Sequence, residues 1–329
     1  MTYDWAFLPM QRSNELLGAP DRLRQRLADD GYLYFEQILP VEKLRRIREQ
    51  ITGVLAGAGW IAGGDEQLDA RVIRTPVREG EDDFWEPLAG VQKLQSFHEF
   101  GHDPVLTDLM HQVVGSTAFA HPLKICRMIF PEFEAISTPP HQDFPNNQGT
   151  EGLTATWIPL SDVPVALGGL AILRGSHRWG PLPLETHLGA GNRCAQLPLD
   201  MLEQCRWVTT EFTLGDVLVF PSLTVHASRH NLSANAMRLS IDYRWQREGE
   251  PLTEGCLSPH FGTLDWEDIY ADWDSDEHQY YWRDLDYRIA PFEELPVHVA
   301  ASAEEMIGEY LRQEHRSNVR RAQRGAVRP

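Results

Sequence analysis

Five short apolar runs lie between about residues 122 and 246, and glycine, proline and asparagine breaks separate them. The runs are LKICRMIF, LTATWIPL, LAILRG, DVLVFPSL and RLSIDYRW. Each is rich in β-branched or other apolar residues and has the length of a strand, not of a globular helix. Many short strands between turn residues are typical of an antiparallel sandwich or barrel. We therefore expect an all-β centre over residues 122–246.

The segment before this centre predicts helix, strand and helix over residues 20–57. Pro20 opens an amphipathic run, YLYFEQ (32–37) has strand character, and Pro40 stands at the first turn of a second helix. Residues 58–95 are rich in glycine and charge and have little periodicity. We expect them to form a long loop or lid in an N-terminal helical layer that spans residues 1–121.

The segment after the centre, residues 247–329, is expected to be a C-terminal extension with a basic helical tail. Ser302 and Glu305 form a capping-box pattern in front of EEMIGEYLRQEHRSNVRRA. The whole chain, residues 1–329, then reads as one catalytic domain of the α+β class.

Composition narrows the class of protein. An apolar content of 42% is enough for a sizeable core, no run approaches the roughly 18 apolar residues of a membrane span, and the N-terminus lacks the order of a signal peptide. We therefore expect a cytoplasmic protein. A net charge of −18 argues against nucleic-acid partners, and four scattered cysteines without a C-x-x-C pair indicate neither disulfides nor a zinc knuckle. The sequence carries no signal for the oligomeric state.

The stretch TPPHQDFPNNQGT contains His141 and Asp143 on either side of Gln142. On a strand, residues i and i+2 face the same side, so the histidine and the aspartate can meet one metal ion. With 13 histidines in the chain, roughly one such spacing is expected by chance. A polar turn after two prolines is therefore an open alternative for this motif alone.

A third ligand is available at the end of the run Gly215–His226. Two histidines and one carboxylate form the facial set that suits non-haem Fe(II) and leaves three coordination positions open. A bidentate 2-oxo acid can take two of these positions and O2 the third. His230, four residues further on, is a rival to His226 because it could share the same strand face.

Arg238 follows His226 by twelve residues and opens the run RLSIDYRW. Its planar fork could bind the distal carboxylate of such an oxo acid in bidentate fashion. The alternative is an ion pair with one of the 48 acidic residues.

Four segments in order carry a resemblance to a known family. They are DGYLYFEQILPVEKLRRIREQI, HQD, TWIPLSDVPVALGGLAILRGSH and the run His226–Ser240. Together they cover about residues 29–246 and resemble the phytanoyl-CoA dioxygenase family of Fe(II)/2-oxoglutarate oxygenases. The family pattern also favours His226 over His230, because Asn231 and Ser233 follow it in the expected register.

The resemblance implies a double-stranded β-helix fold with iron held by His141, Asp143 and His226. It also implies that Arg238 binds 2-oxoglutarate. Three further residues are expected to line that pocket, namely Trp157, Gln142 and Ser240.

The expected reaction is oxidation, foremost hydroxylation, of an unactivated carbon of a small-molecule metabolite, with 2-oxoglutarate converted to succinate and CO2. Desaturation, epoxidation or cyclisation in secondary metabolism are alternatives with the same ligands. Halogenation is disfavoured because Asp143 occupies the position that a halide would need. Other classes are a cupin-like isomerase or hydrolase, and a binding module with a degenerate site.

Several other residues are expected to be structural. We read His177 as a turn cap, and Gly168 with its neighbour as a turn without a phosphate-binding role. Arg71, Arg74 and Arg78 in the expected lid are read as surface charges.

Overall fold

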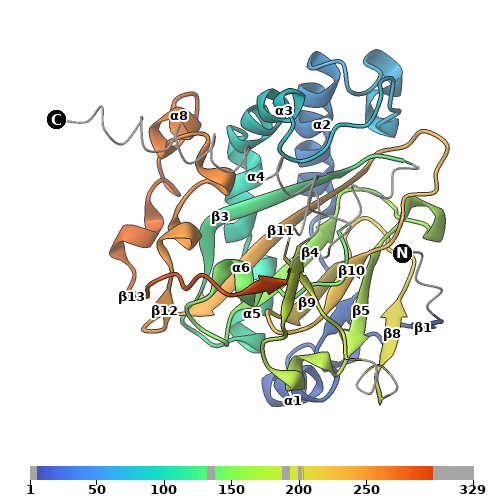
Figure 1. Cartoon of the computed structure of the whole chain (residues 1–329). Helices are drawn as coiled ribbons and strands as arrows, with labels where there is room; N and C mark the ends of the chain where they lie inside the picture. Colours follow the sequence, from blue (N-terminus) through green and yellow to red (C-terminus); the bar gives the residue numbers. More distant parts are fainter. Residues whose placement is uncertain (1–5, 132–137, 187–192, 199–201, 203, 299–329) are drawn as a thin grey trace.

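The computed structural model describes residues 6–131, 138–186, 193–198, 202 and 204–298, and two β-sheets form its centre (Figure 1). Neighbouring strands of the larger sheet are antiparallel throughout. In spatial order they are β2 (Leu33–Phe35), β9 (Val217–Pro221), β4 (Thr154–Pro159), β11 (Arg238–Arg247) and β3 (Ala118–Ile129). The smaller sheet contains β1 (Phe7–Pro9), β8 (Arg206–Thr209), β5 (Leu170–Arg174) and β10 (His226–Ser228). All five runs predicted from the sequence therefore contain strands.

The two sheets pack against each other through a shared apolar cluster. The larger sheet contributes Tyr34, Trp157 and Leu218, and the smaller sheet contributes Ile172 and Val208. All five side chains are buried. Alternation along each strand places these residues inward, so the same inward face also carries the polar side chains of the site described below.

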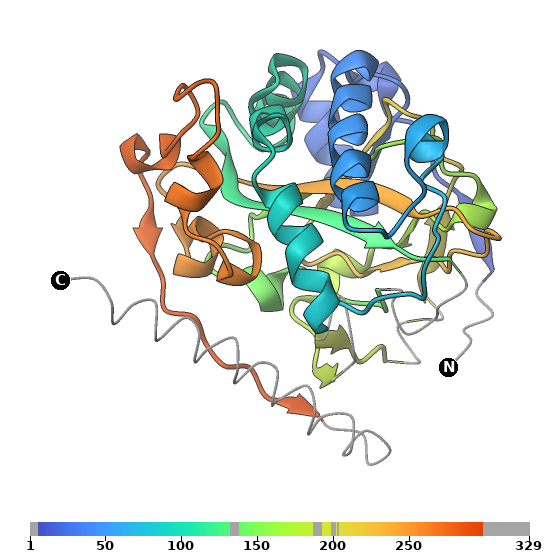
Figure 2. The ribbon, with the colours of Figure 1, turned by 90° about the horizontal axis from the view of Figure 1, so that it is seen from above.

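A layer of helices covers the outer face of the larger sheet (Figure 2). Its helices are α1 (Pro20–Asp30), α2 (Val41–Gly57), α3 (Asp82–Gln92), α4 (Gln95–Glu99) and α5 (Pro104–Val113). On α2, Leu44, Ile47 and Ile51 recur at helical spacing, are fully buried, and belong to the same cluster as Leu239 and Ile241 on β11. Burying a side chain of this size contributes about 1.5–3 kcal/mol relative to leaving it exposed. The fold is thus an α+β double-stranded β-helix with a helical layer, as predicted.

The helix, strand and helix predicted over residues 20–57 are α1, β2 and α2. One detail differs. Pro40 has extended backbone angles and precedes the helix as its N-cap, so α2 begins at Val41 and not at the proline.

The expectation of a long loop over residues 58–95 is wrong in part. Residues Gly64–Asp69 form a short 3-10 helix, and Asp82–Gln92 form α3. Phe84, Leu88 and Val91 lie on one face of α3 and are buried against the helical layer. This apolar spacing outweighs Pro87 inside the helix. Residues 58–63 and 70–81 keep the irregular character that we expected.

The smaller elements complete the chain. They are α6 (Phe144–Asn147), β6 (Leu184–Thr186), β7 (Arg193–Ala195), β12 (Pro251–Leu252), α8 (Trp266–Tyr270), β13 (Arg288–Ile289) and β14 (Val297–His298). The extension after β11 packs as an aromatic cluster that includes Trp266, Tyr270 and Trp282. The helix predicted behind Ser302 lies outside the described residues. Within the described residues, no helix is both long and apolar enough to cross a membrane.

Candidate active site

His141, Asp143 and His226 meet between the two sheets. One possible ligand atom from each residue lies within 4.8 Å of the others, and all three residues are buried. The Nε2 atoms of His141 and His226 lie 4.0 Å and 3.9 Å from Asp143 Oδ1. His230, the rival third ligand, is exposed and does not join this group.

The backbone brings the three residues together in a way that differs from the sequence interpretation. His141 and His226 form a two-way backbone bridge, in which each N–H donates to the other carbonyl at 3.0 Å. Asp143 does not continue a strand, because it has helical backbone angles and directly precedes α6. His226 does not lie at the end of β9, because β9 ends at Pro221 and the chain crosses to begin β10 in the smaller sheet.

Both imidazoles are held by backbone carbonyls on their far side. His141 Nδ1 lies 2.8 Å from the carbonyl of Pro139, and His226 Nδ1 lies 3.0 Å from the carbonyl of Thr224. A carbonyl can only accept, so each Nδ1 carries the hydrogen and each Nε2 keeps a free lone pair. This arrangement orients metal-binding histidines in many proteins.

Burial sets the charges of the group. Burial lowers the pKa of His141 to about 3, with His226 acting in the same direction, and burial lowers the pKa of His226 as well. Burial alone would raise the pKa of Asp143, but the charges of Arg244, His226 and His141 bring it down to about 2. Two neutral imidazoles and one carboxylate, turned toward one point, fit a divalent metal such as Fe(II).

Arg244 is a residue that the sequence interpretation missed. It lies on β11, is buried, and contacts both oxygens of Asp143 at 3.0 Å and 2.9 Å. The alternating pattern of β11 contained a signal for it, because Arg238, Ser240, Asp242 and Arg244 share the inward face.

Arg238 opens the same strand and is almost fully buried. Its guanidinium donates to Ser228 Oγ at 2.8 Å and to Ser240 Oγ at 3.2 Å, and it lies 5.7 Å from the centre of the Trp157 ring. Its Nε has no hydrogen-bond partner, and no carboxylate of the described residues forms an ion pair with it. Burial lowers its pKa to about 10, so it stays charged. Asp242 also acts on its charge, but a buried cation that forms no ion pair favours an anionic ligand.

One small cavity is lined by both histidines of the triad and by this arginine. Its lining residues are Arg127, Thr138, His141, Trp157, Leu170, Phe220, His226, Ser228, Arg238, Asp242 and Arg244. Of the residues expected around 2-oxoglutarate, Arg238 and Trp157 line the cavity directly. Ser228 was missed, because it faces Arg238 only once β10 and β11 are placed across from each other.

Gln142 and Ser240 do not line the cavity. The Gln142 amide donates to the carbonyls of Gly180 and Leu223 and accepts from the N–H of Leu182. Both N–H groups and the oxygen of this amide thus bond to neighbouring loops outside the cavity, and the expectation that Gln142 lines the 2-oxoglutarate pocket is corrected. Ser240 contacts Arg238 and acts through it.

The residues expected to be structural have structural partners. His177 Nε2 lies 2.9 Å from the carbonyl of Ala28 near the end of α1. Gly168 has a φ of +77° at a tight turn where a β-carbon would meet backbone oxygens. Arg71, Arg74 and Arg78 pair with acidic side chains of their own segment, as expected for surface charges.

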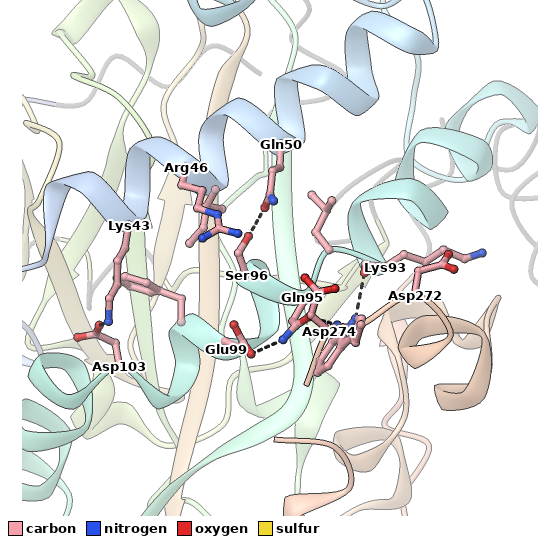
Figure 3. A pocket seen from close by; sticks show the side chains of 14 residues that line it. Lys43, Arg46, Gln50, Lys93, Gln95, Ser96, Glu99, Asp103, Asp272 and Asp274 are labelled. Atoms are coloured by element: carbon pink, nitrogen blue, oxygen red, sulfur yellow. Dashed lines mark hydrogen bonds and ion pairs between the residues drawn. The ribbon is translucent and has the colours of Figure 1, made fainter. Parts of the chain in front are cut away.

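A wider hollow lies on the outer side of the molecule, between α2 and residues 93–103 and 272–274 (Figure 3). Its polar side chains largely pair with one another. Lys43 contacts Asp103 at 2.6 Å, and Gln95 donates to Glu99 at 2.6 Å. The hollow contains no group of metal-binding side chains. We therefore place the chemistry in the inner cavity.

Two curated relatives of this chain carry the name of the same hydroxylase. The chain is 25% identical over 276 residues to a 1-deoxypentalenic acid 11-beta-hydroxylase of Streptomyces exfoliatus, covering 75% of this chain and 94% of the relative. It is 27% identical over 260 residues to the enzyme of that name from Streptomyces arenae, covering 74% and 87%.

Solved structures share the fold. The epimerase SnoN, in complex with Fe3+, alpha-ketoglutarate and nogalamycin RO, matches with a TM-score of 0.52 at 19% identity, over 71% of this chain and 85% of that chain. The non-heme monooxygenase ThoJ in its apo form matches with a TM-score of 0.50 at 14% identity, over 93% and 100%.

The family assignment rests on sequence as well as on fold. The family model for phytanoyl-CoA dioxygenase matches residues 27–240, which is more than half of the chain and includes the triad and Arg238. The chain therefore belongs to the phytanoyl-CoA dioxygenase family and is a non-haem enzyme that uses Fe(II) and 2-oxoglutarate.

Proposed function

We propose that this enzyme hydroxylates an unactivated carbon of a small-molecule metabolite. One observation carries the proposal. The cavity is lined by both histidines of the buried metal-binding group and by Arg238, a buried arginine that forms no ion pair with a described carboxylate. This pairing of a metal-binding set with an anion-binding residue is what an iron enzyme with a 2-oxo acid as cosubstrate requires.

Each of these residues has one role in the proposal. His141, His226 and Asp143 hold the iron through their Nε2 and carboxylate atoms. Arg238 binds the distal carboxylate of 2-oxoglutarate, and Ser228 and Trp157 keep its guanidinium in place. When bound, iron and 2-oxoglutarate supply, with O2, the oxidising power for attack on a C–H bond, and 2-oxoglutarate leaves as succinate and CO2.

The cavity wall contributes by excluding water. Leu170, Phe220 and Trp157 form an apolar part of the lining and are each buried. Phe220 also packs on the ring of His226, with 4.5 Å between the centroids. A dry site strengthens the contact between Arg238 and an anionic cosubstrate and limits side reactions with solvent.

The names of the curated relatives support hydroxylation among the possible outcomes, because both are hydroxylases of a small carboxylic acid, 1-deoxypentalenic acid. Desaturation, epoxidation and cyclisation use the same protein groups and are the second candidates. A cupin-like isomerase or hydrolase is disfavoured because Arg238 would then have no distal carboxylate to bind. The cytoplasmic location and the single catalytic domain over residues 1–329 stay predictions.

The test is an incubation of the enzyme with metabolite pools in the presence and absence of 2-oxoglutarate. Mass spectrometry separates most outcomes, because desaturation and cyclisation remove two hydrogens and epimerisation leaves the mass unchanged. Hydroxylation and epoxidation both add one oxygen atom, and NMR of the product distinguishes a hydroxyl group from an epoxide. Succinate release that depends on the substrate pool, together with a product that gained one hydroxyl group, supports the proposal. A product that lost two hydrogens would show that the reaction is desaturation or cyclisation and not hydroxylation.

A further inference from the structure

Three arginines line the cavity, namely Arg127, Arg238 and Arg244, and Asp242 lies in the same wall. If Arg238 serves 2-oxoglutarate and Arg244 serves Asp143, Arg127 is left for another partner. Arg127 lies on β3 opposite Ser240 of β11, so it faces the same interior as the residues of the site. Its charge contributes to lowering the pKa of His141, which shows that it is close to the metal group.

Arg127 has two loose contacts. Its Nε lies 3.5 Å from Asp242 Oδ2, and its Nη1 lies 3.3 Å from Glu79 Oε2. Strong charge-assisted hydrogen bonds are about 2.7–2.9 Å long, so neither contact is optimal. Asp242 also interacts with Arg244, whose charge lowers the pKa of Asp242 more than the charge of Arg127 does.

Glu79 comes from outside the sheet. It lies in the irregular stretch of residues 70–81. Two backbone hydrogen bonds join the start of this stretch to the residues just before Arg238. Val72 N–H donates to the carbonyl of Asn235, and Met237 N–H donates to the carbonyl of Ala70. Its side chain is 18% exposed and that of Arg127 is 15% exposed. Both side chains are thus mostly buried, and the Glu79 carboxylate reaches Arg127 from a segment outside the sheet.

Arg244 offers a second donor to the same cavity. Its Nη1 is buried and without a hydrogen-bond partner, although its other nitrogens face Asp143. A buried unpaired guanidinium N–H is costly and is satisfied when an oxygen acceptor binds. Arg127 and Arg244 therefore line a cavity in which an anionic oxygen ligand would gain two partners.

We propose that Arg127 binds a carboxylate of the substrate, with Arg244 Nη1 as a further donor in the same cavity, and that Glu79 occupies Arg127 until the substrate enters. The substrate is then a carboxylic acid, and its carboxylate replaces Glu79 as the partner of Arg127. This inference rests on the proposed function, since it names the substrate class of the same site.

The experiment uses the full chain and acetate as the probe, because acetate equals the part of the Glu79 side chain beyond its β-carbon. The protein is loaded anaerobically with Fe(II) and saturating 2-oxoglutarate so that Arg238 is occupied. Binding of carbon-13-labelled acetate is followed by NMR. We expect Glu79→Ala to bind acetate at least tenfold more tightly than the wild type, where the tethered Glu79 competes. Acetamide, which has no charge, should not bind.

Two further variants make the result specific. Glu79→Ala combined with Arg127→Gln should lose the gain in acetate affinity. Glu81→Ala is the matched control, because Glu81 lies on the same segment but contacts Arg78, accepting from its backbone N–H at 3.0 Å and lying 3.9 Å from its Nε. This variant should behave as the wild type. If the Arg127→Gln variant unfolds because Asp242 loses its partner, the experiment uses the double variant Arg127→Gln with Asp242→Asn in its place.

The proposal is overturned if Glu79→Ala binds acetate with the same affinity whether or not Arg127 is present. It is also overturned if an identified substrate contains no carboxylate, or if Arg127→Gln leaves the KM of an acidic substrate unchanged. Failure of the proposed function looks different, since loading with Fe(II) and 2-oxoglutarate would then give no visible charge-transfer band. In that case the acetate titration is repeated in the Arg238→Gln background, which removes the other carboxylate site.

Discussion

Arg244 contacts both carboxylate oxygens of Asp143, with Nη2 3.0 Å from Oδ1 and Nε 2.9 Å from Oδ2. Both residues are buried, and Asp143 Oδ1 is the atom that lies nearest to the two imidazoles. The arginine therefore fixes the direction in which this carboxylate presents its lone pairs. It also keeps the carboxylate ionised inside the protein.

The first prediction concerns iron binding by the Arg244→Gln variant. Removing a residue that orients a metal ligand typically costs about 10- to 100-fold in metal affinity or activity. We expect Fe(II) affinity, measured by anaerobic competition with a chelator, to fall within this range. Arg247→Gln is the control, because Arg247 lies at the exposed end of β11 and donates to the carbonyl of Val114. A rise in affinity would mean that Arg244 competes with the metal instead of orienting its ligand.

The second prediction concerns the stability of the metal-free protein. Asp143→Ala removes the ion-pair partner of the buried Arg244, and removing one partner of a buried ion pair costs about 3–5 kcal/mol. Urea unfolding should show this loss in free energy. The double variant Asp143→Ala with Arg244→Met should recover most of it, since no buried charge remains. Neither variant should support turnover, and equal stability of the two would show that the ion pair is energetically unimportant.

The third prediction distinguishes the two histidines near β10. His226→Ala should abolish Fe(II) binding, because His226 is buried with its Nε2 turned toward Asp143. His230→Ala should bind iron as the wild type does, since His230 is exposed. Fe(II) titrations of the two variants measure the difference in affinity. A larger loss of affinity in His230→Ala would show that His230, and not His226, is the iron ligand.

The fourth prediction concerns the cosubstrate. Arg238→Gln should raise the KM for 2-oxoglutarate roughly ten- to more than a hundredfold, because a hydrogen bond to a charged group contributes about 1.5–3 kcal/mol. Iron affinity should change little. Arg238→Lys should be intermediate, since it keeps the charge but loses the planar fork. An unchanged KM in folded Arg238→Gln protein would remove this residue from the cosubstrate site.

Sequence patterns predicted much of the centre of the molecule and less of its edges. The core strands could be predicted because each one is a short apolar run between turn residues. Such a run reflects both the local backbone preference and the burial of its side chains. The helix α3 was missed because glycine, charge and Pro87 dominate its neighbourhood, although Phe84, Leu88 and Val91 keep a helical spacing. Its burial depends on packing against α2, which no local pattern reveals.

The residues of the site also differ in how far the sequence could predict them. His141, Asp143, His226 and Arg238 could be named from motifs because each stands in a recognisable short segment. Ser228 and Arg127 could not, since their roles arise from strands that are distant in the chain and adjacent in space. Arg244 was missed although the alternation of β11 places it on the same face as Arg238. Gln142 was misassigned because sequence proximity to a ligand does not show where its amide points.

Anaerobic visible spectroscopy tests the central claim that this cavity is an Fe(II)/2-oxoglutarate site. Addition of Fe(II) and 2-oxoglutarate to the wild-type protein should produce a weak visible metal-to-ligand charge-transfer band. The band should be absent in His226→Ala, retained in His230→Ala, and reached in Arg238→Gln only at higher 2-oxoglutarate concentrations. The absence of any band in folded wild-type protein at saturating Fe(II) and 2-oxoglutarate would contradict the account.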